Sequence, residues 1–218
     1  MYGREIDRIS RNLLTLSTKT LGGTYLMIRQ FEEKKTYTPE EYLTLEVNSE
    51  TRNEYINREI IPMTGGTPRH NRISGNLYIS LSIELKRKPY EVFHVDQRLW
   101  IPEFSLYTYP DVMVVPKPIE LQVGRKDTVC NPYFIAEVLS QSTQNYDRSE
   151  KFSCYRSLPN FQEYLLIDQS KIHVEHYIKQ GTNQWIFSEY KDPEFTLSFP
   201  SLELQIEIGD FYEGIDFT

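Results

Sequence analysis

The amino-acid sequence predicts a single α/β domain built on a mixed β-sheet. Short apolar runs of strand length alternate with stretches in which apolar residues recur at helical spacing. Two of the apolar runs carry an acidic residue: Asp111 precedes Val112–Val115, and Glu137 lies within Tyr133–Leu139. The 218 residues, of which 39% are hydrophobic, suffice for one domain with a core and are too few for two full-sized ones.

Helix and hairpin signals dominate the first half of the chain. Thr38-Pro39-Glu40-Glu41 is a capping box with proline at the first helical position, which predicts a short helix. The segment 52–63 predicts a β-hairpin with its turn at Asn57-Arg58. A loop with Gly and Pro follows. A helix of roughly His70 to Lys86 comes next, in which Ile73, Leu77, Leu81 and Leu85 recur every four residues.

Strands dominate the second half. A strand is expected at 92–96, followed by the strands that carry Asp111 and Glu137. The polar loop 140–143 then leads into a helix of about Tyr146 to Ser157. The remaining expected elements are a buried strand at 164–168, a hairpin at 171–190 that turns around Gly181-Thr182-Asn183, and a half-exposed alternating strand at 202–208.

Composition and charge narrow the functional classes. The net charge of −7 argues against extensive coating by nucleic acid, because phosphate contacts rest on Lys and Arg, but it leaves room for a local basic surface. Cys130 and Cys154 have no CxxC spacing, so neither a disulfide framework nor a zinc site is predicted, and a reducing, cytoplasmic location is expected. No apolar stretch has the length of a membrane span.

Residues 1–26 are predicted to be a weakly ordered leader, with one domain over 27–218. Arg4, Arg8 and Arg11 precede a short apolar run, as they would in a signal peptide. Lys19 interrupts that run and no small-residue cleavage site follows, so export is not expected.

The two acidic residues are the strongest chemical signal in the sequence. A carboxylate in so apolar a segment is costly unless it is paired, hydrogen-bonded or bound to a cation. Two of them on neighbouring strands are what an oxygen-preferring ion such as Mg²⁺ requires. Asp111 and Glu137 therefore predict a metal-dependent hydrolase site, and the alternative is that each carboxylate caps a loop.

The expected helix after the Glu137 strand offers a cation. Asp147, Lys151 and Tyr155 are spaced i, i+4, i+8 and share one helical face. A lysine near two metal-binding carboxylates can hold the attacking water or stabilise charge on a phosphate. The alternative is an ordinary surface ion pair between Asp147 and Lys151.

Three further residues are weaker candidates for the same site. Glu54 in the hairpin would add a third carboxylate, or else is a solvated strand residue. His70, at the start of its helix, would ligate metal or shuttle a proton, or else is an exposed helix-start histidine. Asp96 is the weakest of the three. His173 and His176 fall on opposite faces of their strand, so a shared zinc ion is not expected.

Other chemistries lack their signatures. The sequence contains no GxxxxGK[ST] loop and no GxGxxG, which would indicate nucleotide-binding folds. It also contains no GxSxG, the elbow of serine hydrolases.

The ordered set of these residues resembles a known family. Pro110-Asp111 followed by Glu137 on the next strand is similar to the PD-(D/E)xK nuclease superfamily, and the finer pattern resembles the Uma-two family, whose members are assigned as bacterial endonucleases. The resemblance covers about Tyr37 to Ile208. The matching features are Glu54-Tyr55-Ile56, Met63, His70, Tyr109–Val112, Glu137–Thr143, Asp147, Lys151, Tyr155 and Glu163–Asp168.

This resemblance implies a restriction-endonuclease-like fold, a central mixed β-sheet flanked by helices. It implies that Asp111 and Glu137 bind Mg²⁺ (or Mn²⁺) and that Lys151 replaces the lysine that the older motif would place at Leu139. Leu139 shares a strand face with Glu137 yet is apolar, which agrees with a cation supplied from the following helix. Glu54 and His70 match positions that the family places near the site. The sequence departs from the family pattern at Asn57-Arg58, where Asp-Gly is favoured, and in the leader.

Two main functional hypotheses follow. The first is a metal-dependent endonuclease that hydrolyses phosphodiesters of DNA. The second is a non-catalytic binding or assembly module that keeps the nuclease fold, and hydrolysis of a small phosphate ester is a third option. The sequence leaves homo-oligomer formation open. Candidates for a local basic DNA-binding surface are Arg69, Arg72, Lys86-Arg87-Lys88, Arg148 and Arg156.

Overall fold

A computed structural model describes residues 18–21, 24–27 and 35–217. The chain divides into two compact units, Met1–Lys35 and Thr36–Thr218. In the first unit, β1 (Thr18–Leu21) pairs antiparallel with β2 (Thr24–Met27). Most of the predicted leader 1–26 lies outside the described residues, so both the leader and the boundary at Met27 stay predictions.

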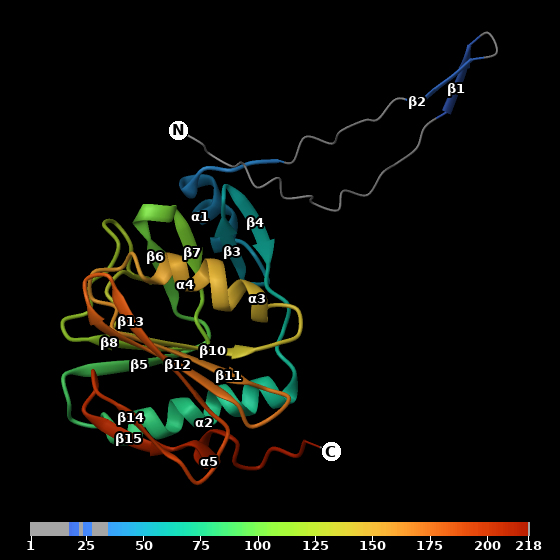
Figure 1. Cartoon of the computed structure of the whole chain (residues 1–218). Helices are drawn as coiled ribbons and strands as arrows, with labels where there is room; N and C mark the ends of the chain where they lie inside the picture. Colours follow the sequence, from blue (N-terminus) through green and yellow to red (C-terminus); the bar gives the residue numbers. More distant parts are fainter. Residues whose placement is uncertain (1–17, 22–23, 28–34, 218) are drawn as a thin grey trace. The chain divides into compact units, whose positions relative to one another are not determined.

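A six-stranded mixed sheet forms the centre of the second unit (Figure 1). Its strand order is β13-β12-β11-β10-β8-β5, and only β10 and β11 among these neighbours run parallel. The mixed sheet predicted from the sequence is therefore confirmed. The strands are β5 (Tyr90–His94), β8 (Val112–Pro116), β10 (Phe134–Leu139), β11 (Glu163–Asp168), β12 (Val174–Gly181) and β13 (Gln184–Tyr190).

Both faces of this sheet are covered, which explains why its central strands are nearly continuous apolar runs. In β8, Val112 and Val114 belong to one hydrophobic core, whereas Met113 and Val115 belong to another. The first core packs against α2 (Pro68–Glu84), α5 (Ile208–Phe211) and the pair β14 (Thr196–Phe199) and β15 (Leu204–Glu207). The second core packs against a helical segment on the opposite face, and Figure 1 shows the sheet between these two layers.

That helical segment contains an irregular turn. It consists of α3 (Gln144–Tyr146), a π-helical turn η2 (Asp147–Lys151) and α4 (Phe152–Tyr155). The sequence predicts a regular helix over about 146–157, so the helix is confirmed but its wide turn is a new finding. Such π-turns often occur at functional sites.

A second sheet, of which the sequence analysis predicts only the hairpin at 52–63, adds five strands in the order β4-β3-β7-β6-β9. The 3-10 turn η1 (Pro102–Phe104) joins β6 to β7, and α1 (Pro39–Val47) packs on this sheet through a cluster of Tyr42, Tyr55 and Tyr107. The strands are β3 (Asn53–Ile56), β4 (Glu59–Pro62), β6 (Arg98–Ile101), β7 (Leu106–Thr108) and β9 (Thr128–Val129).

The predicted local signals at α1 and at the β3–β4 hairpin are present. At the capping box, Glu41 N donates to Thr38 Oγ1 over 3.2 Å and Thr38 N donates to Glu41 Oε2 over 2.7 Å. At the hairpin turn, Asn57 and Arg58 have φ of 50° and 68°. These positive angles are those of a type I′ turn, so Arg58 adopts a conformation that Gly would adopt at lower cost.

Within the described part of the chain, none of the helices combines the length and apolarity that crossing a membrane requires. The two cysteines, Cys130 and Cys154, are both free, as their spacing predicts.

Candidate active site

Asp111 and Glu137 converge where β8 begins and β10 approaches its end. Because Val112 pairs with Ala136 in the antiparallel register, Asp111 lies across from Glu137. Asp111 N lies 3.4 Å from Glu137 Oε2, and Val138 N donates to Asp111 Oδ2 over 2.7 Å. The two carboxylates predicted from the sequence are therefore neighbours in space.

Lys151 completes this pair from the helical segment. Its Nζ lies 2.9 Å from Glu137 Oε1 and 3.7 Å from Asp147 Oδ1. Tyr155 OH donates to the same Glu137 oxygen over 2.6 Å. Asp147, Lys151 and Tyr155 are all buried, so the shared helical face turns toward the site and the surface ion-pair alternative is wrong.

Glu54 joins the site from β3 in the second sheet. Its Oε1 lies 3.6 Å from Lys151 Nζ and accepts a hydrogen bond from Thr108 Oγ1 of β7. The Glu54 side chain is 13% exposed, which excludes the alternative of a solvated strand residue. Sequence reasoning did not single out Thr108, because a lone threonine at the end of a short strand carries no distinctive pattern.

His70 contacts Asp111 from the first turn of α2. Its Nε2 lies 3.1 Å from Asp111 Oδ2, and both side chains are 16% exposed. Thr67 caps the helix by accepting a hydrogen bond from His70 N over 3.1 Å, and this bond fixes the backbone from which the imidazole extends. Burial disfavours the imidazolium, but the hydrogen bond and charge of Asp111 outweigh it and raise the pKa of His70. His70 is thus not the exposed histidine of the alternative reading.

Asp96 does not belong to this group. Its side chain is 73% exposed and pairs with Arg52 Nε over 3.5 Å. Its place in the sequence, at the end of the β5 segment, suggested a candidate, but the chain turns outward after β5. His94 lies closer: its Nε2 is 3.1 Å from Ser74 Oγ, and the neighbouring Val95 N donates to the backbone oxygen of Asp111. The alternation of residues around His94 predicts a strand but gives no sign that His94 lies near Asp111.

Carboxylates outnumber cationic side chains in the site. The carboxylates of Glu54, Glu137 and Asp147 all lie close to the ammonium of Lys151. A fourth carboxylate, that of Asp111, belongs to the residue next to Glu137. Burial raises the pKa of Glu137; Lys151 opposes this effect, and the charges of Asp111 and Asp147 add to it. For Lys151, burial disfavours the charge, but Glu137, Glu54 and Asp147 outweigh it and hold the pKa well above its ordinary value. Lys151 is therefore a fixed cation.

The donor set fits a hard divalent cation. Asp111 and Glu137 offer carboxylate oxygens, which Mg²⁺ and Mn²⁺ prefer, and sulfur donors are absent from the group described above. Within residues 35–217, Asp111 Oδ1 makes no hydrogen bond or ion pair, so one oxygen remains for a ligand. An added cation would also offset the surplus of negative charge.

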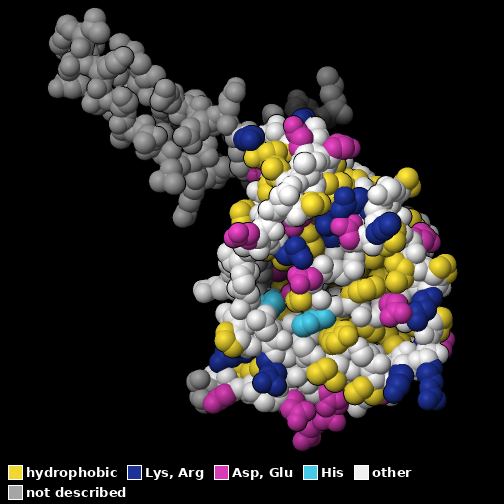
Figure 2. All heavy atoms as spheres, turned by 180° about the vertical axis from the view of Figure 1, so that it is seen from behind, with side chains coloured by type: hydrophobic (Ala, Val, Ile, Leu, Met, Phe, Trp, Pro, Cys, Tyr) yellow, Lys and Arg dark blue, Asp and Glu magenta, His cyan; other side chains and the backbone are white. Residues whose placement is uncertain are grey.

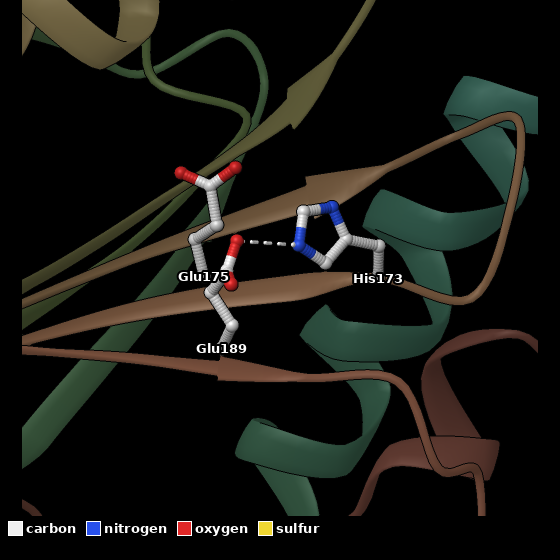
Figure 3. Close-up of side chains that lie close together, drawn as sticks. All are labelled: His173, Glu175 and Glu189. Carbon is white, nitrogen blue, oxygen red and sulfur yellow. Dashed lines mark hydrogen bonds and ion pairs between the residues drawn. The ribbon is translucent and has the colours of Figure 1, made fainter.

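A second cluster, His173, Glu175 and Glu189, lies on β12, on the residue just before it and on β13 (Figure 3). Ligand atoms of His173, Glu175 and Glu189 lie within 4.8 Å of one another, and His173 Nε2 is 3.2 Å from Glu189 Oε1. His176 turns to the other face, where its Nε2 is 3.0 Å from Glu163 Oε2. The prediction that His173 and His176 fall on opposite faces of their strand is confirmed.

On the face shown in Figure 2, basic and acidic side chains are interspersed. Arg148 pairs with Glu175 over 2.7 Å, and Arg69 Nη2 donates to the backbone oxygen of Asp216 over 2.6 Å. The guanidinium of Arg156 stacks over Phe152, 4.9 Å from the ring centre. A local basic surface therefore stays a prediction.

Comparison with known proteins adds relatives to this geometry. The "Uncharacterized protein sll1609" of Synechocystis sp. (strain ATCC 27184 / PCC 6803 / Kazusa) is 41% identical over 170 residues, which cover 78% of this chain and 96% of that protein. The "Uncharacterized protein slr1290" of the same organism is 32% identical over 182 residues, 83% of this chain and 93% of that protein.

A solved structure shares the fold. The crystal structure described as "a putative nuclease belonging to DUF820" from Anabaena variabilis ATCC 29413 superposes with a TM-score of 0.65 at 22% identity, covering 80% of this chain and 97% of that one. Residues 39–209 match the family model Uma2, described as "Putative restriction endonuclease". That match spans both sheets and every candidate site residue, and the chain belongs to the Uma2 family.

Proposed function

We propose that this protein is a metal-dependent endonuclease that hydrolyses phosphodiester bonds of DNA. The observation that carries the proposal is the convergence of Asp111 and Glu137 with Lys151, whose Nζ is 2.9 Å from Glu137 Oε1. Membership of the Uma2 family and the likeness to a nuclease fold support the same reaction class.

Asp111 and Glu137 would hold Mg²⁺ or Mn²⁺, which when bound supplies Lewis acidity toward water and phosphoryl oxygens. The residues of the chain then have separate tasks. The ammonium of Lys151 stabilises negative charge that develops on the phosphate. Glu54 and Asp147 keep that ammonium charged and in place, and Tyr155 orients Glu137 through its hydrogen bond.

His70 contacts Asp111, the other carboxylate of the proposed metal site. Its Nε2 bonds to Asp111 Oδ2 together with Val138 N, so Oδ1 is the oxygen left for the cation. The imidazole, with its raised pKa, is also a proton source within reach of the site.

The test is nicking of supercoiled plasmid in Mg²⁺ or Mn²⁺. Asp111→Ala and Glu137→Gln are expected to lower the rate by at least about a hundredfold, since each removes a ligand of the ion. Lys151→Met is expected to lower it by about a hundredfold through loss of charge stabilisation. Asp96→Ala removes an exposed carboxylate outside the site and is the matched control. If all of these proteins nick equally, the activity is a contaminant.

One observation favours a second function, a non-catalytic binding or assembly module. Glu137 Oε1 is already engaged by Lys151 and Tyr155, and Asp111 Oδ2 by His70 and Val138, so the network is partly closed without a ligand. Calorimetric titration separates the two functions. The endonuclease requires Mg²⁺ or Mn²⁺ binding that Asp111→Ala abolishes, whereas the module requires no such binding.

A further inference from the structure

A groove of about 1070 Å³ is lined by residues that adjoin members of the candidate active site along the chain. Its lining comes from the start of α2, from the end of β10 and the loop after it, and from the residues that follow β11. Lining residues that matter for the argument are Arg69, Gln141, Ser142, Gln144, Asp168 and Gln169.

Three of the elements that line this groove continue directly into the site. Arg69 precedes His70, which contacts Asp111. Leu139, also in the lining, follows Val138, whose N–H holds Asp111. Gln144 begins the helical segment that carries Lys151. A substrate that places a phosphate between Asp111 and Lys151 therefore meets the groove with its adjoining residue.

The lining is close to electrically neutral. Of the residues that line the groove, Arg69 and Asp168 carry opposite formal charges, and the others are hydroxyl, amide or apolar side chains. Duplex DNA is held mainly by Lys and Arg contacts to phosphate, which such a lining does not provide. The volume is that of a site for a small organic ligand, so it suits a nucleotide or two of one strand.

Two glutamines in the groove are fixed so that they present hydrogen-bond donors. Thr67 Oγ1 accepts from His70 N and donates to Gln169 Oε1 over 2.6 Å. Arg148 Nη1 donates to Gln144 Oε1 over 2.8 Å. With both carbonyl oxygens engaged, the amide nitrogens of Gln144 and Gln169 remain to donate to carbonyl acceptors of a ligand.

We propose that this groove receives an unpaired nucleotide next to the scissile phosphate and that Gln144 and Gln169 donate hydrogen bonds to the edge of its base. The inference rests on the proposed function and narrows its substrate to DNA with a single-stranded segment. Single-stranded bases expose their edges for this type of reading, whereas duplex bases have those edges paired.

Binding without cleavage tests the groove. Fluorescence anisotropy in EDTA would compare a labelled short oligothymidylate, whose base offers two carbonyl acceptors, with a duplex of equal length. Wild-type protein is expected to bind the single strand at least about tenfold more tightly than the duplex. Gln169→Leu is expected to weaken single-strand binding about fivefold through loss of one base contact. Gln205→Leu, an exposed glutamine on β15, is the matched control and should bind as wild type.

Gln169→Leu also removes the hydrogen bond from Thr67 and could disturb the loop before α2, so a second variant tests the groove independently. Ser142→Glu places a negative charge in the groove at an exposed position and is expected to weaken strand binding about tenfold. The proposal is overturned if the duplex binds as tightly as the single strand, or if both groove variants bind as wild type.

Cleavage separates this proposal from the one on which it rests. Asp111-dependent nicking, together with groove variants that bind and cut as wild type, refutes the groove and leaves the endonuclease intact. Strand binding that depends on Gln169 and Ser142, without cleavage of either plasmid or single-stranded DNA in Mg²⁺ or Mn²⁺, supports the groove and refutes the endonuclease. If no oligonucleotide binds, the groove proposal is refuted whatever the nicking result.

Discussion

The two acidic clusters lie on the same face of the six-stranded sheet, and one helical segment supplies a cation to each. Lys151 reaches Glu137, and Arg148 reaches Glu175. Arg148 is matched to a single carboxylate, with Tyr177 OH donating to the other oxygen of Glu175 over 3.2 Å. Lys151 is shared by three carboxylates. Proximity of acids is thus common to both clusters, and the number of carboxylates that share one cation distinguishes the candidate active site.

The clusters also differ in how the chain assembles them. His173, Glu175 and Glu189 come from one hairpin, in which Glu175 and Glu189 are direct cross-strand partners. The candidate active site draws on both sheets, on α2 and on the η2 turn. A cluster on adjacent strands follows from local pairing alone, whereas the second arrangement needs the whole domain to fold.

The largest effect on folding stability is expected from Lys151→Met. The side chain is 8% exposed, and its loss leaves buried carboxylates without their cation, which should lower the free energy of unfolding by about 3 kcal/mol. Arg148→Met is the matched change in the other cluster. Arg148 is 29% exposed, so water can replace it, and a loss of about 1 kcal/mol is expected. Urea denaturation in EDTA measures both, and equal losses would remove the distinction between the clusters.

Divalent cations should stabilise the protein through one cluster only. At a Mg²⁺ concentration about a hundredfold above its Kd, the expected gain is about 2.7 kcal/mol, because the ion binds the folded state. Asp111→Ala should abolish the gain and Glu189→Gln should retain it. Urea denaturation with and without Mg²⁺ provides the measurement. Loss of the gain in Glu189→Gln instead would place the ion in the hairpin cluster.

A smaller effect is expected at the loop before α2. A Cβ on Gly66 would lie 2.7 Å from Asn71 Oδ1 and 2.8 Å from His70 Nδ1, whereas a Cβ on Gly65 meets nothing within 4 Å. Gly66→Ala should therefore cost about 1 kcal/mol and displace the His70 imidazole. Gly65→Ala is the control, with little or no loss. Denaturation and the NMR resonances of the His70 ring measure the two effects; unchanged resonances in Gly66→Ala would show that the loop does not position His70.

The sequence predicts those parts of the fold that carry strong local signals. The capping box locates the start of α1, and the four-residue apolar repeat locates α2, whose observed bounds differ by two residues at each end. The apolar runs around Asp111 and Glu137 locate β8 and β10 because both of their faces are buried. In the second sheet the hairpin of β3 and β4 is predicted, but β6, β7 and β9 are not. β9 has two residues and β7 three, too few for an alternating pattern.

The candidate site is predictable in part for the same reason. A carboxylate inside an apolar strand is conspicuous, so Asp111 and Glu137 stand out, and their proximity in space is confirmed. Glu54 lies on a half-exposed strand, which gives no sign of a functional role. Its contact with Lys151 depends on how the second sheet packs against the helical segment 144–155, and no local sequence pattern encodes that packing. The catalytic and metal-binding roles of these residues remain predictions.

The wide turn at Asp147–Lys151 makes the helix sensitive to residue number as well as to residue type. Each residue of an α-helix advances the chain by about 100° around the axis. A π-turn takes up one residue more than a regular turn, so deleting one residue from 148–150 would restore regular winding and leave α4 in nearly its present orientation, with Asp147 and Lys151 three residues apart instead of four. The wide turn therefore absorbs one residue that would otherwise turn the rest of the helix by that angle, and it sets the spacing at which Asp147 and Lys151 both face the pocket.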